Sequence, residues 1–196
     1  MINRKLIVFI LLLSNLTFAQ KEKENSNPIL FVEGFLGGGG GKISGVLIGG
    51  NLNYQHENSL FTFRVSQLAN FKLAFLLLPD VTSYNEEYGL LYGKRYIKNG
   101  RSLSFSGGIS HNTYETKHIN NEVEIVNKTK HIGLAFEASI MWFKANKKRY
   151  RIYRIIPVGK PTAFGHSFGF KLSGNISKQS YIGVSMIMGF GWHKKY

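Results

Sequence analysis

Six charged residues stand where apolar side chains alternate with small or polar ones, always on the polar side of the alternation. They are Glu33, Arg64, Glu87, Arg95, Glu137 and Lys171. If these segments are strands, all six side chains point to the same face of one sheet. Charged residues of both signs on an enclosed face also suit a polar pore or a catalytic cluster. We expect them to pair structurally inside a narrow barrel, because a barrel of about eight strands is filled by its own side chains.

Residue types that could support hydrolysis or metal binding are present, but their spacing favours neither chemistry. The scattered histidines include no pair four residues apart around a glutamate, the usual zinc pattern; they are His56, His111, His118, His131, His166 and His193. His166–Ser167 and Ser110–His111 offer a base beside a nucleophile, but adjacent strand residues point to opposite faces. The chain also has no Gly-x-Ser-x-Gly motif. We therefore predict no catalytic residue, no metal site and no cofactor.

The elements that must position these residues are strands, and the clearest is the segment 181–192. Its even positions are all apolar and its odd positions mostly small or polar; the even set is Ile182, Val184, Met186, Met188, Phe190 and Trp192. A period of two over about eleven residues matches a tilted strand that crosses a bilayer. The segment therefore predicts a closing barrel strand with one face toward lipid.

Seven further segments with the same period bring the predicted number of strands to about eight, an even number typical of single-chain bacterial barrels. They lie near 29–37, 43–56, 61–66, 86–97, 102–110, 131–143 and 165–176. Tight turns are predicted at 57–59, 98–100 and 177–180, and a glycine loop at 37–41. The segments 67–83 and 116–130 are predicted to be external loops. The predicted fold is an all-β, antiparallel, up-and-down transmembrane β-barrel.

The N-terminus predicts export. Residues 1–19 have a basic start, an apolar run at 6–13 and a small-x-small site at 17–19, which is typical of a secretory signal peptide. Residues 20–28 form a charged, flexible leader, and 29–196 the barrel domain. No segment after 19 is long and apolar enough for a membrane helix. With no cysteine, the chain has neither a lipid-anchor site nor disulfides.

Aromatic and basic residues indicate where the barrel meets the membrane surface. Four aromatic residues fall at the predicted periplasmic ends of alternate strands, on the apolar face, as an aromatic girdle requires: Tyr54, Tyr96, Trp142 and Trp192. A basic segment, 144–154, interleaves tyrosines with Lys144, Lys147, Lys148, Arg149, Arg151 and Arg154. We expect it to anchor the protein at lipid head groups. The segment 144–164 is too long for a periplasmic turn, and either an extra strand at 149–156 or longer flanking strands would account for it.

Three short motifs add a resemblance to these patterns. They are LLYGKR at 90–95, GLAFEA at 133–138 and the final GNISKQSYIGVSMIMGFG. They are similar to a set of uncharacterised barrel proteins that carry an L-L-Y-G strand and a short N-x-x-x-x-S hairpin before the last strand. More broadly, the export signal, the strand alternation and the aromatic ending make residues 29–196 resemble the small outer-membrane β-barrels of Gram-negative bacteria, the group of OmpX and the OmpA membrane domain. The resemblance implies a fold and a location but no activity. The long insertion at 144–164 departs from the pattern.

The sequence therefore predicts a non-enzymatic outer-membrane barrel with a structural or surface-interaction role through its external loops. The net charge of +14 suggests, in an exported protein, anionic lipids and lipopolysaccharide rather than nucleic acid. The barrel-assembly machinery is the other expected partner, and a monomer is favoured. The alternatives are a lipid-modifying barrel enzyme, a narrow pore and a soluble, lipocalin-like periplasmic binder.

Overall fold

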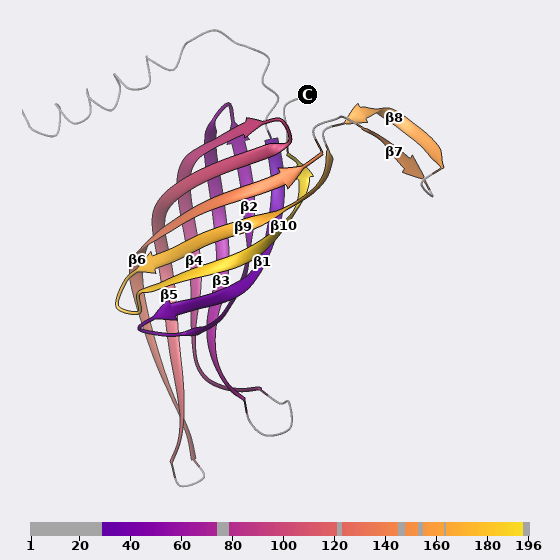
Figure 1. Cartoon of the computed structure of the whole chain (residues 1–196). Helices are drawn as coiled ribbons and strands as arrows, with labels where there is room; N and C mark the ends of the chain where they lie inside the picture. The colour runs from indigo at the N-terminus through magenta and orange to yellow at the C-terminus, as the bar shows by residue number, and fades with distance from the viewer. Residues whose placement is uncertain are drawn as a thin grey trace, which may run out of the picture.

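Eight antiparallel strands close into a barrel in the computed structural model, which describes residues 29–73, 79–120, 123–144, 148–152, 155–162 and 164–193 (Figure 1). Around the barrel the order is β1-β10-β9-β6-β5-β4-β3-β2. The barrel strands are β1 (Ile29–Gly41), β2 (Gly45–His56), β3 (Ser59–Leu73), β4 (Pro79–Lys98), β5 (Arg101–Asn120), β6 (Val123–Phe143), β9 (Phe164–Ile176) and β10 (Tyr181–Trp192). This confirms the predicted all-β, up-and-down barrel. The part of the chain that the structure describes contains no helix that could span a membrane.

The barrel carries its apolar side chains on the outside. Along β10 every even residue is exposed and every odd residue buried, with Met188 at 69% and Ile187 at 0% exposure. The same alternation in the other barrel strands follows the faces expected from the sequence. Because the period is two, one residue of known orientation fixes a whole strand.

Two turns join strands in the way their residues predict. Asn99 and Gly100 connect β4 to β5 with φ angles of 49° and 75°, the pair of positive angles of a type I′ hairpin turn. Glu57 lies in the turn between β2 and β3 with a φ of 54°. Both turns lie at the barrel end where β10 finishes.

The glycine run 37–41 is not the loop that the sequence suggested, because these residues form the last part of β1. Gly38 pairs with Val46 of β2 and with Val184 of β10. A Cβ on Gly37 would lie 2.0 Å from the carbonyl oxygen of Val184. The run therefore lets neighbouring strands approach closely rather than breaking the strand.

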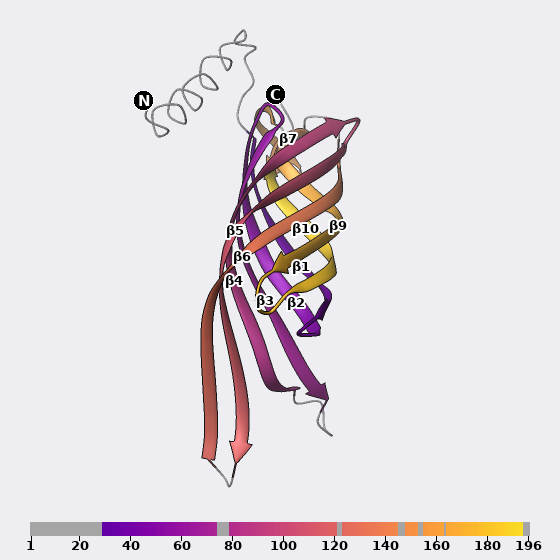
Figure 2. The same ribbon diagram turned by 90° about the vertical axis from the view of Figure 1, so that its left-hand side faces the viewer.

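The predicted external loops 67–83 and 116–130 are also mostly strand. β3 continues to Leu73 and β4 begins at Pro79, while β5 and β6 stay paired from Thr116↔Asn127 to Asn120↔Val123. Residues 126–130 are all exposed, so both faces of this hairpin meet solvent. The apolar alternation stops there although the backbone ladder continues, which is why sequence periodicity missed these strands. Figure 2 shows β5 and β6 projecting furthest beyond the barrel.

The insertion between β6 and β9 contains two short strands where the sequence suggested one strand or longer flanking strands. β7 (Lys148–Ile152) and β8 (Ile156–Thr162) pair with each other in a separate two-stranded sheet. Figure 1 places this sheet beside the barrel end opposite the long hairpins. The predicted signal peptide (1–19) and leader (20–28) lie outside the described residues.

Candidate functional site

The centre of the barrel interior is held by Lys171 of β9 and the two carboxylates that it joins. Lys171 Nζ donates to Glu33 Oε2 at 2.9 Å and to Glu137 Oε2 at 3.4 Å. Asn51 Nδ2 bridges the same two carboxylates, at 3.3 Å to Glu33 and 3.1 Å to Glu137. Ser106 Oγ adds a further bond to Glu137 at 3.3 Å. All five residues are buried, so the ammonium group is compensated by direct ion pairs.

A second group of bonds centres on Glu87 of β4. Arg64 donates to Glu87 Oε1 from Nε, at 2.9 Å, and from Nη2. Asn175 Nδ2 and the Tyr181 hydroxyl each donate to Glu87 Oε2 at 2.8 Å. Arg64 Nη1 also lies 3.6 Å from Glu137 Oε2, which joins the two groups into one network.

This interior network draws at least one residue from every barrel strand. In the order of the chain the members around the three carboxylates are Glu33, Asn51, Arg64, Glu87, Ser106, Glu137, Lys171, Asn175 and Tyr181. Hydrogen bonds through Ser110 and Asn112 extend the network from Asn175 to Asn85. Each member is at most 8% exposed. The side chains therefore cross-link the whole wall and occupy the space that a pore would need, as expected for an eight-stranded barrel.

Arg95, the sixth predicted interior charge, lies outside this network, toward the Asn99–Gly100 turn. Its guanidinium carbon lies 4.5 Å from the centre of the Phe31 ring and 5.6 Å from that of Phe143. Its Nη1 donates to Gln55 Oε1 at 2.8 Å and to the carbonyl oxygen of His193 at 3.2 Å. Aromatic faces and neutral acceptors hold this buried cation, so Arg95 fills the end of the barrel near the turns.

Apolar side chains enclose the network at both ends of the interior. Leu47 and Leu68 face each other across the β2–β3 pair on the side of the long hairpins. Ile29, Leu60 and Met141 lie on the side of the short turns, each at most 2% exposed. Apolar side chains therefore border the polar centre toward both ends, beside the buried Asn85 and Asn112 on the side of the long hairpins.

The four predicted girdle aromatics all lie on the outer wall, near the end with the short turns. Their exposed fractions are 42% for Tyr54, 53% for Tyr96, 37% for Trp142 and 39% for Trp192. Phe164 stacks edge-on against both Phe190 and Trp192, with ring centres 4.5 Å and 5.2 Å apart. Aromatic rings therefore cluster where β9 begins and β10 ends.

A serine and a histidine do meet, although not the neighbouring pairs seen in the sequence. Ser167 Oγ lies 3.3 Å from His193 Nε2 inside the barrel, whereas His166 points outward. His193 Nδ1 has no hydrogen-bond partner among the described residues, so no carboxylate orients the ring there. Among those same residues no group of three or more His, Cys, Asp or Glu side chains could hold a metal ion. Two of the three groups of a hydrolase are thus assembled, but without an acid.

The predicted basic segment divides between the wall and the insertion. Lys144 is exposed at the end of β6, while Lys148, Arg149 and Arg151 belong to β7. Lys147 and Arg154 lie outside the described residues. The six basic residues are therefore not one continuous strand of the barrel.

The extension formed by β4, β5 and β6 carries its own polar contact. The Tyr84 hydroxyl donates to Glu115 Oε2, and Lys128 forms an ion pair with the same carboxylate. These residues lie nearer the hairpin tips than Tyr88. Between Tyr88 and the tip, no described side chain of β4 is both apolar and exposed. The hydrogen bond to Glu115 raises the pKa of Tyr84 to about 12, and Glu115 also raises the pKa of Lys128.

Sequence reasoning identified the charges of the interior but not their uncharged partners. Asn51, Asn175 and Tyr181 complete the network, and strand periodicity alone placed them on the inner face. Their residue types give one further signal in the sequence, because a buried amide or phenol needs a hydrogen-bond partner. Which partner each one meets depends on how the barrel closes.

Among the solved structures with the same architecture are three from bacterial proteins. The N-terminal β-barrel domain of Pseudomonas aeruginosa OprF has a TM-score of 0.52 and 12% identity, covering 84% of this chain and 99% of that domain. Neisserial surface protein A gives 0.53 and 10%, covering 84% and 96%. Ail, the attachment invasion locus protein of Yersinia pestis, gives 0.52 and 11%, covering 85% and 98%. No protein-family model and no curated protein sequence matches the chain. At these identities the likeness defines the fold, and the chain has the fold of the eight-stranded outer-membrane β-barrels.

Proposed function

We propose that this protein is a non-enzymatic outer-membrane β-barrel that presents two long β-hairpins outside the cell for contact with other molecules. The outer wall supports the membrane location, because its exposed residues are mainly Leu, Ile, Val, Phe and Met. An apolar belt of this size is unfavourable in water and suits lipid. A lipocalin-like binder would need the opposite arrangement, with an apolar cavity inside and polar residues outside.

The two barrel ends suggest the orientation. The tight turns and the aromatic cluster occupy one end, which in such barrels faces the periplasm, while the β3–β4 and β5–β6 hairpins extend from the other. The expected partners at the membrane remain those of the sequence: outer-membrane lipids, lipopolysaccharide and the barrel-assembly machinery. A monomer suits a barrel whose interior is satisfied by its own side chains.

The main support for a surface role is the open edge of β6. β6 pairs with β9 only from Leu134 onward, so residues 123–133 pair on one side with β5 and, within the described part of the chain, with no strand on the other. Such an edge presents unpaired backbone donors and acceptors to an extended segment of a partner. Lys128 and Lys130 on this stretch limit pairing between copies of the chain, since lysines on an edge oppose it.

The absence of enzymatic activity is supported by the Ser167–His193 geometry. Both side chains are buried, and no acidic residue in the described part of the chain orients His193. A hydrolase needs a base held by a third group beside an accessible nucleophile. Release of fatty acid from phospholipid vesicles by the purified barrel, abolished in a Ser167→Ala variant, would contradict this part of the proposal.

Orientation can be tested with single cysteines, because the chain has none of its own. We expect Val126→Cys to react with a membrane-impermeant maleimide on intact Gram-negative cells. Asn58→Cys, in the β2–β3 turn, should react only after the outer membrane is opened. The reverse labelling pattern would show that the barrel has the opposite orientation. Recovery of the protein in the soluble periplasm would contradict the membrane location.

The role of the hairpin can be tested by shortening it without disturbing the barrel. Thr116 pairs with Asn127, so replacing residues 117–126 with Asn-Gly preserves the register below. Cells expressing the full or the shortened protein are compared for attachment to protein-coated wells and for settling of cell suspensions. We expect shortening to reduce attachment or settling while heat-modifiable gel mobility is unchanged. If cells with the full protein and cells with the shortened protein gave the same result in both assays, this would contradict a surface role for the hairpin.

A further inference from the structure

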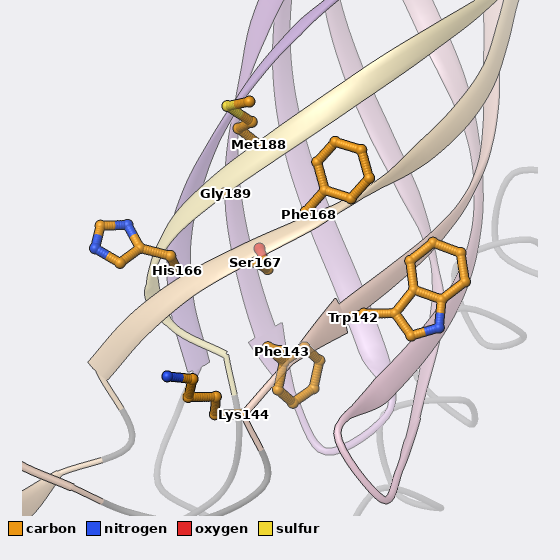
Figure 3. Close-up of a pocket in the computed structure, with 8 residues that line it drawn as sticks. All are labelled: Trp142, Phe143, Lys144, His166, Ser167, Phe168, Met188 and Gly189. Carbon is orange, nitrogen blue, oxygen red and sulfur yellow. The ribbon is translucent and has the colours of Figure 1, made fainter.

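A groove opens in the outer wall where β6 leaves the barrel. The last pair between β6 and β9 is Phe143↔Ser167, whereas β9 stays paired with β10 as far as Phe164↔Trp192. The chain departs there into the insertion that contains β7 and β8. The resulting groove has a volume of about 580 Å³, within the range of small-molecule sites, and is lined by residues of β6, β9 and β10 (Figure 3).

The outward-facing side chains around this groove lie in two rows across the three strands, with the inward-facing Phe143 and Ser167 between them. The first row is apolar: Trp142 pairs with Phe168, and Phe168 pairs with Met188. Their exposed fractions are 37%, 41% and 69%. This row offers a continuous surface to a hydrocarbon chain.

The second row lies one outward position nearer the barrel end and has two polar members. It contains the exposed Lys144 and His166, the latter packed on Phe190 with ring centres 4.9 Å apart. Figure 3 shows Lys144 and His166 on the side of the groove away from Met188 and Phe168. An ammonium group and an imidazole beyond an apolar row match the order of groups along a phospholipid, with the head group past the acyl chain.

The charge around the groove favours an anionic head group. Among the described residues that line it, none is acidic. The sequence 144–164 that continues from its rim carries seven Lys or Arg residues and no Asp or Glu. Basic residues near a membrane surface favour anionic lipid.

We propose that this groove is a binding site for one anionic phospholipid of the periplasmic leaflet. Its acyl chain packs on Trp142, Phe168 and Met188, and its phosphate lies between Lys144 and His166. The inference rests on the membrane location proposed above and adds to it a defined lipid at a defined place on the wall.

Trp142 provides the probe, because the chain has only two tryptophans. A Trp192→Phe variant leaves Trp142 as the sole emitter beside the groove. The folded barrel is reconstituted in phosphatidylcholine vesicles that contain a minor fraction of phosphatidylglycerol, with bromine on the acyl chains of one lipid or the other. Bromine quenches tryptophan only at close range, so quenching reports which lipid occupies the groove.

We expect brominated phosphatidylglycerol to quench Trp142 well beyond its mole fraction. Lys144→Gln should lower the preference for it about fivefold, the factor that corresponds to ~1 kcal/mol. His166→Gln should lower the preference further. Lys178→Gln is the matched control, since Lys178 is exposed in the turn between β9 and β10 at the opposite end and should leave the preference unchanged.

The outcomes separate this site from the membrane location itself. Equal quenching by the two lipids in proportion to their amounts, or an unchanged preference in Lys144→Gln, would overturn the site while leaving the barrel in the bilayer. No quenching by either lipid would mean that Trp142 does not face hydrocarbon, which would contradict the proposed function as well.

Discussion

Arg64 of β3 and Glu87 of β4 form a fully buried ion pair inside the barrel, with Arg64 Nε 2.9 Å from Glu87 Oε1 and exposed fractions of 0% and 1%. Their strands are neighbours, yet the pair also reaches across the interior. Arg64 donates to the carbonyl oxygen of Phe136 on β6 at 3.1 Å, and Glu87 accepts from Asn175 on β9 at 2.8 Å. This pair therefore connects opposite parts of the wall.

Removing one partner should leave an uncompensated charge in the interior. We expect Arg64→Met to lower the free energy of unfolding by about 3–5 kcal/mol, because Glu87 and Glu137 both lose their guanidinium partner. Adding Glu87→Gln to this variant should recover part of the loss. Urea unfolding of the barrel in lipid vesicles, followed by tryptophan fluorescence, measures both effects. Glu57→Gln, in an exposed turn, serves as the control, and a loss in Arg64→Met no larger than the control's would show that the pair is not structural.

A charge on the outer wall should be costly only if the wall faces lipid. Met186 lies mid-way along β10, is 58% exposed and pairs with Leu36 and Phe170. We expect Met186→Lys to lower the free energy of unfolding in vesicles by roughly 2–4 kcal/mol. Met186→Leu should change it little. If the two variants are equally stable, Met186 faces water and the wall is not in a bilayer.

The interior network predicts that the barrel does not conduct ions. Its members are held by direct hydrogen bonds and ion pairs, with apolar side chains on both sides of the central carboxylates. Planar bilayers with the purified protein should show no stepwise conductance at moderate voltage. The Arg64→Met variant should also show no stepwise conductance as long as it stays folded. Regular steps from the unmodified protein would support the narrow-pore alternative.

The long hairpins should respond to alkaline pH through Tyr84. The pKa of this phenol is raised to about 12 because its hydroxyl donates to Glu115. A raised pKa means that the contact stabilises the hairpin fully below the ordinary tyrosine value near 10 and that this contribution disappears as pH rises through about 12. The difference between the ultraviolet titrations of the unmodified protein and Tyr84→Phe isolates this group.

Glu115→Gln provides the test of the cause. We expect the Tyr84 pKa to fall toward its ordinary value in this variant, because the neutral amide accepts the same hydrogen bond without the negative charge that disfavours the phenolate. An unchanged midpoint would assign the shift to another part of the hairpin, such as Glu86, which also raises the pKa of Tyr84.

Strand faces could be predicted residue by residue, because a strand has only two of them. In β9 the sequence alone placed Lys171 and Ser173 inside and Phe170 and Leu172 outside, as the structure has them. Strand ends were less predictable. The stretch 116–130 lacks apolar alternation, and both faces meet solvent at 126–130, so its backbone pairing left no trace in the pattern.

The contacts between interior residues, unlike the strand faces, could not be predicted from the local pattern. Periodicity and residue type placed Glu33 and Lys171 on the inner face, but not opposite each other, since they are 138 residues apart. The contact of Ser167 with His193, rather than with its neighbour His166, likewise depends on β9 lying beside β10 at one fixed register. No local pattern encodes such a relation.

The sequence by itself determined that the protein is built of strands with an apolar and a polar face, and which residues belong to each face. This follows from steric rules that act between near neighbours in the chain. Only the tertiary structure decided which charges pair, how far the hairpins extend, and where the departure of β6 opens a groove in the wall. These features depend on the register and closure of eight strands at once, which bring together groups whose separation along the chain carries no signal.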